Sequence, residues 1–254
     1  MVARLPKDKL LKYSSNVQQM IGKKFCTLRE LKSLCGQLEF STTVVRGGKP
    51  FLRRLYDAMC GLRKPLTRIT ITNEMIADMN VWREFLSVYN GTTIIACVPE
   101  VTSNSIHLYS DSSKCGYGGV YLSHFIYGHF LLSWRESDIQ ALEIYPIYLL
   151  IHIFSHQLKD LCVTFHCDNS AVVGAINSPT SRNKKVMGLL RPLVSTLLKF
   201  NIKFKAVHIP GKRNILCDKL SRFQVTDALL RQYGMDSEPT AVPTHLRPPN
   251  CVWR

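Results

Sequence analysis

Four acidic residues in the second half of the chain occupy positions where a carboxylate would need a cationic partner: Asp111, Glu143, Asp168 and Asp218. Asp111 and Asp168 each end a run with β-strand patterning, Glu143 lies on the apolar stripe of a helical pattern, and Asp218 opens a short helical stretch. Burying carboxylates costs free energy unless cations gather them. Two divalent ions would do so, and such a constellation hydrolyses phosphodiesters.

The positive charge of the chain is concentrated towards its N-terminus. The formal net charge is +15, and residues 1–70 carry 15 Lys and Arg against 4 Asp and Glu, whereas the remainder carries 18 against 14. This asymmetry suits a polyanion held by one part and processed by another, with simple solubility charge as the plain alternative. A length of 254 residues with 46% hydrophobic and 20% charged residues indicates a globular protein of one large or two modest domains.

The cysteine pattern and the apolar runs bear on localisation. The nine cysteines are scattered and include no C-x-x-C pair, which favours a reducing intracellular compartment, the cytoplasm and/or the nucleus. The start of the chain lacks the apolar core of a signal peptide. The longest apolar run, residues 144–154, is too short to span a bilayer, so we expect a soluble protein with no membrane partner.

Residues 1–100 predict a mainly helical, basic segment. Thr27 and Glu30 form a capping-box pattern that opens one helix, a second short helix begins at Pro50, and a third follows Asn73. The turn and small polar residues of 90–105 predict a linker.

From Ser105 the periodicity changes to that of an α/β domain ending near residue 223, followed by a short helix and a Pro-rich tail over 224–254. Strands are expected at 105–111, 116–122, 129–134, 163–168 and 204–209. Helices are expected at 137–157, opened by a capping box at Ser137, and at 171–176, 183–200, 214–222 and 227–233. The order βββαβαβα predicts a mixed sheet with helices on its faces.

Motifs throughout this domain carry a family resemblance. They are Tyr109-Ser-Asp111-Ser-Ser, Ala141-Leu-Glu143-Ile, His166-Cys-Asp168-Asn-Ser, and His208-Ile-Pro-Gly211 followed by Asn214-Ile-Leu-Cys-Asp218-Lys-Leu-Ser-Arg222. In this order they resemble the ribonuclease H family, most of all its retroelement branch. The front of the chain resembles the thumb and connection region before ribonuclease H in DIRS-like and Ngaro-like retrotransposons. There the cues are Leu31-x-Ser-Leu-x-Gly-x-Leu38, Pro50-Phe-Leu-Arg-Arg-Leu55 and Trp82.

The resemblance implies a ribonuclease H-like fold and an endonuclease from a reverse transcriptase polyprotein that hydrolyses the RNA strand of RNA–DNA hybrids. It implies that Asp111, Glu143 and Asp168 hold two Mg²⁺ ions, with Asp218 completing the set and Mn²⁺ as an alternative metal. The expected substrate contacts are Ser112, Ser113, Asn169, Ser170, Lys212 and Arg213. No Tyr-x-Asp-Asp polymerase motif occurs in the chain.

Three alternatives stay open from the residues alone. The acids at the strand ends can simply cap loops, the chain can be a catalytically silent nucleic-acid binder, or it can be a DNA-cleaving enzyme on the same fold. Among the histidines, His208 falls on a strand and is expected to be structural, and His152 and His156 are expected to pack within a helix. If the four acids converge, at least one should have a raised pKa.

Overall fold

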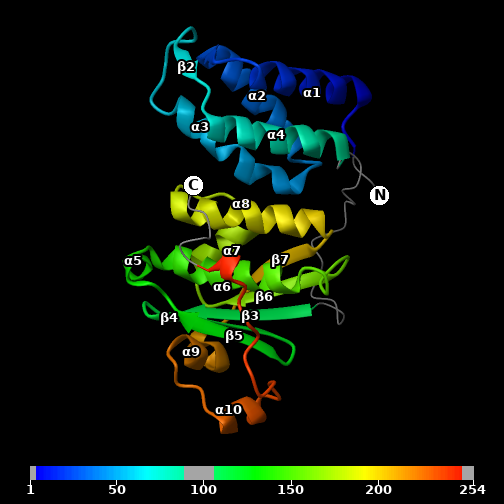
Figure 1. The fold of residues 1–254 in the computed structure, drawn as a ribbon. Helices are drawn as coiled ribbons and strands as arrows, with labels where there is room; N and C mark the ends of the chain where they lie inside the picture. The colour runs from blue at the N-terminus through cyan, green and yellow to red at the C-terminus, as the bar shows by residue number, and fades with distance from the viewer. Residues whose placement is uncertain (1–3, 89–105, 248–254) are drawn as a thin grey trace. The chain divides into compact units, whose positions relative to one another are not determined.

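The structure is a computed structural model that describes residues 4–88 and 106–247. The chain divides into two compact units, Met1–Cys97 and Val98–Arg254 (Figure 1). The predicted linker, residues 90–105, lies wholly outside the described residues.

The first unit is mainly helical, as predicted. Its helices are α1 (Lys7–Ile21), α2 (Leu28–Ser41), the 3₁₀ turn η1 (Arg46–Phe51), α3 (Arg53–Met59) and α4 (Asn73–Val88). The capping box is present: the Thr27 hydroxyl accepts from the Glu30 amide, and the Glu30 carboxylate accepts from the Thr27 amide. Two short antiparallel strands, β1 (Phe25–Thr27) and β2 (Arg68–Thr70), were not predicted, because three-residue strands are too short to show a period.

The second unit contains the predicted mixed α/β sheet. Within the described residues its strands are β3 (Ile106–Ser112), β4 (Gly116–Tyr121), β5 (His124–His129), β6 (Cys162–Cys167) and β7 (Lys203–His208). Their spatial order is β5-β4-β3-β6-β7. β3 is central, pairing antiparallel with β4 and parallel with β6, and β6 pairs parallel with β7.

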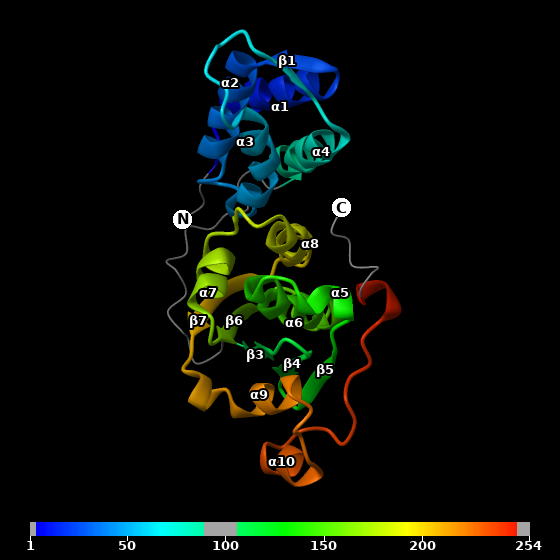
Figure 2. The same ribbon diagram turned by 90° about the vertical axis from the view of Figure 1, so that its left-hand side faces the viewer.

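Helices cover both faces of this sheet. One face carries α6 (Ile139–Phe154), α7 (Ser170–Asn177) and α8 (Lys184–Lys199), and the other carries α9 (Ile215–Ser221) (Figure 2). The short helices α5 (Leu132–Arg135) and α10 (Asp227–Gln232) and the 3₁₀ turns η2 (Gly211–Arg213) and η3 (Thr244–Leu246) complete the unit. All but four residues of α6 are buried, which explains its continuous apolar sequence.

The third strand was predicted in the wrong place. Strand β5 runs from His124 to His129, not over 129–134, because β4 and β5 are joined by a two-residue turn at Leu122 and Ser123. Leu122 adopts a positive φ of 52° there, and the turn lacks the Gly or Asn that usually announces a hairpin. The residues after β5 form α5 instead of a strand.

The start of α6 was also misassigned by one residue. Asp138, not Ser137, is the N-cap, and its carboxylate accepts a 2.8 Å hydrogen bond from the Gln140 amide. The Ser137 hydroxyl instead accepts a hydrogen bond from Lys185 Nζ of α8. Either residue can cap a helix, so the sequence alone does not separate the two choices.

The segment after α10 follows the outer edge of β5. The amides of Asp236 and Thr240 donate to the carbonyls of Ser123 and Phe125, and the Tyr145 hydroxyl of α6 donates to the Leu246 carbonyl. Covering an edge strand in this way removes unpaired backbone groups from solvent. None of the helices in the described ranges is long and apolar enough to cross a membrane.

Candidate metal centre

The strand register brings Asp111 and Asp168 to one end of the sheet. In the parallel pair β3 and β6, Tyr109 lies opposite His166. Asp111 follows Tyr109 by two residues, and Asp168 follows His166 by two residues. Successive side chains on a strand alternate between faces, so Asp111 projects from the same side as Tyr109. Asp168 directly follows the last residue of β6. Asp111 is buried and Asp168 is half-buried.

Helix α6 supplies the third carboxylate from the opposite face of the sheet. Glu143 is 5% exposed and lies with Cys167 and Asp168 in a group whose potential ligand atoms are all within 4.8 Å of one another. The Cys167 thiol donates to Glu143 Oε2 at 3.9 Å. Asp111 and Asp218 lie outside this tightest group. The charge of Asp111 acts on Glu143, and the charges of Asp168 and Asp218 act on Asp111.

Helix α9 positions the fourth carboxylate. The Asn214 side chain just before α9 donates a 2.8 Å hydrogen bond to the carbonyl of Ser110 in β3, and it is buried. One turn after Asp218, the hydroxyl of Ser221 donates to Asp111 Oδ2 at 2.7 Å. Asp218 itself accepts from Arg222 Nε at 2.6 Å.

The crowding of these acids changes their protonation. Burial, together with the negative charges of Asp111 and Asp168, raises the pKa of Glu143 to about 9. Burial also raises the pKa of Asp111, against the lowering effect of the Ser221 hydrogen bond, and the charges of Asp168 and Asp218 act in the same direction as burial. The expected raised pKa is therefore present, because like charges share a site with little water.

The donor set fits a hard divalent cation. Glu143 and Asp168 offer carboxylate oxygens within 4.8 Å of each other, and the charges acting on Glu143 are those of the carboxylates of Asp111 and Asp168. Cys167 adds a sulfur, but burial and the Glu143 charge raise the pKa of its thiol, so it stays protonated and a poor ligand. Oxygen donors of this kind favour Mg²⁺ or Mn²⁺ over Zn²⁺.

The predicted substrate contacts fall into two groups. Ser112 is buried with its hydroxyl donating to the Leu142 carbonyl at 2.9 Å, and the Ser113 hydroxyl donates to the Ser221 carbonyl at 2.8 Å. The Asn169 side chain caps α7 by accepting from the amides of Ala171 and Val172. These three side chains therefore have structural hydrogen bonds, and their contact with substrate stays a prediction.

The second group is open to solvent. Ser170 is exposed at the start of α7, and Lys212 and Arg213 are exposed in η2. The η2 loop approaches the carboxylates closely, because a Cβ added at Gly211 would lie 3.2 Å from Asp168 Oδ2. The cations of η2 are thus on a loop that adjoins the site, although their role stays a prediction.

Three residues near the carboxylates were not predicted. Cys167 was given no role near the carboxylates, although its place directly before Asp168 brings it against Glu143. Ser221 and Arg222 were noted only as part of a motif, and they hold Asp111 and Asp218 respectively. Their spacing of three and four residues from Asp218 on a helix is the signal that places them near it.

The histidines contribute packing interactions. His152 contacts the Tyr148 carbonyl through Nδ1 and the Thr196 hydroxyl through Nε2. The His156 ring packs edge-on against Phe200. His208, the last residue of β7, has its Nε2 3.0 Å from the main-chain carbonyl of Asp168.

Comparison with known proteins gives distant structural likenesses. No protein-family model and no curated protein matches the chain. The RNase H1 of the halophilic archaeon Halobacterium salinarum NRC-1 is similar at 13% identity with a TM-score of 0.40, covering 47% of this chain and 96% of its own.

Two structures of the foamy viral protease-reverse transcriptase are also similar, each at 12% identity over 77% of this chain. The form in complex with double-stranded DNA has a TM-score of 0.30. The form in complex with an RNA/DNA hybrid has a TM-score of 0.28. The matches cover 34% and 26% of those longer chains. These similarities are distant, and any functional assignment therefore depends on the carboxylates of this chain.

Proposed function

We propose that the second unit is a divalent-metal-dependent endonuclease that hydrolyses the RNA strand of RNA–DNA hybrids. The observation that carries the proposal is the closeness of Glu143 and Asp168, together with the electrostatic interactions that link Glu143 to Asp111 and Asp111 to Asp218. A group of acids that costs free energy to assemble, with Glu143 held protonated in the absence of a cation, is expected where a cation is to be bound.

The residues would have different roles according to their positions. Asp111, Glu143, Asp168 and Asp218 would hold the ions, and Ser221 and Arg222 orient two of these carboxylates. When bound, the ions would lower the pKa of the attacking water and stabilise the departing 3′ oxygen. The exposed Lys212 and Arg213 would contact the substrate backbone beside the site.

We also propose that the chain derives from a retroelement reverse transcriptase, with an intracellular location in the cytoplasm or the nucleus. The proposal rests on the sequence resemblance carried by the Leu31–Leu38 pattern and Trp82. The basic first unit would add sequence-independent affinity for a polyanion.

A strand-specific cleavage assay tests the proposal. A hybrid labelled separately on its RNA and DNA strands is incubated with the full chain, with and without Mg²⁺. We expect Mg²⁺-dependent loss of full-length RNA, intact DNA, and no cleavage by the Asp111→Asn variant. The Asp227→Asn variant, changed at an exposed acid in α10, is the matched control and should cleave normally.

Two other results would each select a rival. Cleavage of the DNA label would identify a DNA-cleaving enzyme on the same fold. Binding of the hybrid that is unchanged by Asp111→Asn, without cleavage by either protein, would leave a catalytically silent nucleic-acid binder.

A further inference from the structure

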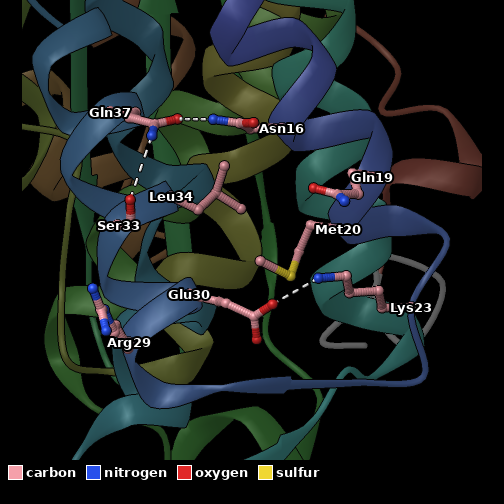
Figure 3. A pocket seen from close by; sticks show the side chains of 9 residues that line it. All are labelled: Asn16, Gln19, Met20, Lys23, Arg29, Glu30, Ser33, Leu34 and Gln37. Atoms are coloured by element: carbon pink, nitrogen blue, oxygen red, sulfur yellow. Dashed lines mark hydrogen bonds and ion pairs between the residues drawn. The ribbon is translucent and has the colours of Figure 1, made fainter. Parts of the chain in front are cut away.

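A pocket of about 280 Å³ lies in the first unit between α1 and α2 (Figure 3). Its α1 side consists of Asn16, Gln19 and Met20, which share one face of the helix, together with Lys23 just beyond the helix end. The volume is just below the usual range of about 300–1,000 Å³ for small-molecule sites, so the pocket suits a small group.

The α2 side of the pocket presents a matching face. Gln37 lies opposite Asn16, Ser33 lies one turn before Gln37 on α2, and Leu34 lies beside Ser33 (Figure 3). Met20 and Leu34 are 6% and 2% exposed and supply the apolar surface. The pocket thus combines an apolar surface with a polar wall.

The polar wall retains unused hydrogen-bonding groups. Asn16 Nδ2 donates to Gln37 Oε1 at 2.9 Å, and Gln37 Nε2 donates to the Ser33 hydroxyl at 3.4 Å. A primary amide has two N–H donors and one carbonyl acceptor, so Asn16 keeps a donor and its carbonyl, and Gln37 keeps a donor. The Gln19 side chain forms no hydrogen bond with any residue of the described ranges.

The charges at the rim favour a neutral group next to an anionic one. Lys23 and Glu30 form a 2.7 Å ion pair, which leaves that side of the pocket without net charge. Arg29 is exposed, and its guanidinium has no partner among the residues that the structure describes. A phosphate could therefore be held at Arg29 while the group attached to it enters the pocket.

An exposed aromatic ring lies two residues after Lys23 in the sequence. Phe25 in β1 is 41% exposed, and the Arg68 guanidinium of β2 lies 3.6 Å from the centre of its ring. Exposed rings beside cations are the elements on which unpaired bases stack in single-stranded nucleic-acid sites.

We propose that this pocket binds one unpaired nucleobase of a single-stranded nucleic acid. Adenine is the expected base, because the amides of Asn and Gln can pair with its edge through two hydrogen bonds. This site belongs to the first unit and uses none of the carboxylates of the second, so it does not depend on the proposed nuclease function.

The test measures binding of the full chain, in chelator, to a short thymidine strand that contains either one adenine or one abasic position. We expect the adenine strand to bind at least about tenfold more tightly, corresponding to about 1.4 kcal/mol. The Ser33→Phe variant, which fills the pocket from an exposed position on α2, should abolish this difference. The matched control Ser15→Phe, exposed on α1 and outside the pocket, should preserve it.

Photocrosslinking locates the contact. A strand carrying one 8-azidoadenine should crosslink to residues 16–37 in the parent and in Ser15→Phe, and not in Ser33→Phe. Should Ser33→Phe fail to fold, as judged by circular dichroism, Gln37→Leu takes its place.

Several results would overturn the proposal. They are equal binding of adenine and abasic strands, a difference that survives both pocket variants, and crosslinks confined to residues 106–247. Displacement of the strand by an equal concentration of free adenosine monophosphate would show that the pocket takes free nucleotides instead. Loss of RNA cleavage, by contrast, would bear only on the second unit.

Discussion

Ser221 and Asp111 are 110 positions apart in the chain, and the Ser221 hydroxyl donates a 2.7 Å hydrogen bond to Asp111 Oδ2. The bond joins the C-terminal end of α9 to the central strand of the sheet. It favours the ionised form of Asp111, because an O–H donor is attracted more strongly to a carboxylate than to a carboxylic acid. Helix α9 therefore carries Asp218 and also favours the ionised form of Asp111, which is the form that binds a cation.

Replacing Ser221 by Ala should weaken metal binding without unfolding the protein. A hydrogen bond to a charged group contributes about 1.5–3 kcal/mol, so the Mg²⁺ concentration for half-maximal binding should rise about tenfold or more. This Mg²⁺ concentration is measured by calorimetric titration with Mg²⁺ and by the Mg²⁺ dependence of hybrid cleavage. Ser237→Ala, at an exposed serine, is the control, and an unchanged titration for Ser221→Ala would contradict the role assigned to this bond.

Glu143 should make the stability of the metal-free protein dependent on pH. Its pKa is about 9 in the fold against an ordinary value of 4.5, so between these values the folded state retains a proton that the unfolded state releases. Stability must then decrease as pH rises through this window. In the Glu143→Gln variant, which cannot ionise, that decrease should disappear.

Thermal denaturation in chelator measures this effect. Between about pH 5 and about pH 9, the melting temperature of the parent should fall further than that of Glu143→Gln. Glu238→Gln, changed at an exposed acid, should follow the parent. Parallel profiles for the parent and Glu143→Gln would mean that Glu143 is not held protonated.

The sequence indicated which carboxylates would lie near one another, because their positions follow from simple geometry. Asp111 and Asp168 end runs with strand patterning, and parallel strands bring their equivalent ends to one edge of a sheet. Glu143 was identified because a charged residue on the apolar stripe of a helix contradicts the pattern around it. At these residues the sequence motifs and the hydrophobic periodicity indicated the same positions, so the closeness of these carboxylates could be predicted.

Features without a local signal were not predicted. The β4–β5 turn at Leu122 and Ser123 has no Gly or Asn, so its positive φ is imposed by strand pairing rather than by the turn residues. The hydrogen bond from Ser221 to Asp111 also depends on how α9 packs on the sheet. Tertiary packing decides such contacts, and one sequence does not contain a local pattern for them.

Gly118 should be required for the packing of α9 on β4. A Cβ at this position would lie 2.5 Å from the Leu220 Cβ and 2.8 Å from the Cys217 carbonyl oxygen, so Gly118→Ala must displace the helix. We expect a loss of about 1–3 kcal/mol in stability, together with lower cleavage because Asp218 moves with α9.

Gly174 provides a matched Gly→Ala control. It lies within α7, and a Cβ there would meet nothing within 4 Å, so Gly174→Ala should be neutral or stabilise by about 0.5–1 kcal/mol. Chemical denaturation of both variants measures the difference. A Gly118→Ala protein as stable and active as Gly174→Ala would show that α9 does not pack closely at this point.

The basic first unit should make hybrid binding strongly dependent on salt. Each phosphate contact releases condensed counterions and contributes about 0.9 to the slope of log affinity against log salt. Arg63 and Lys64 are exposed in the loop between α3 and β2. Their double replacement by Gln should reduce the slope by up to about 2 if both contact phosphates, as measured by fluorescence anisotropy.

Replacing the exposed Lys7 and Lys12 of α1 makes the same change in net charge and tests whether the effect is local. An equal change in slope for both pairs would indicate a diffuse charge effect, and an affinity independent of salt would remove the first unit from substrate binding.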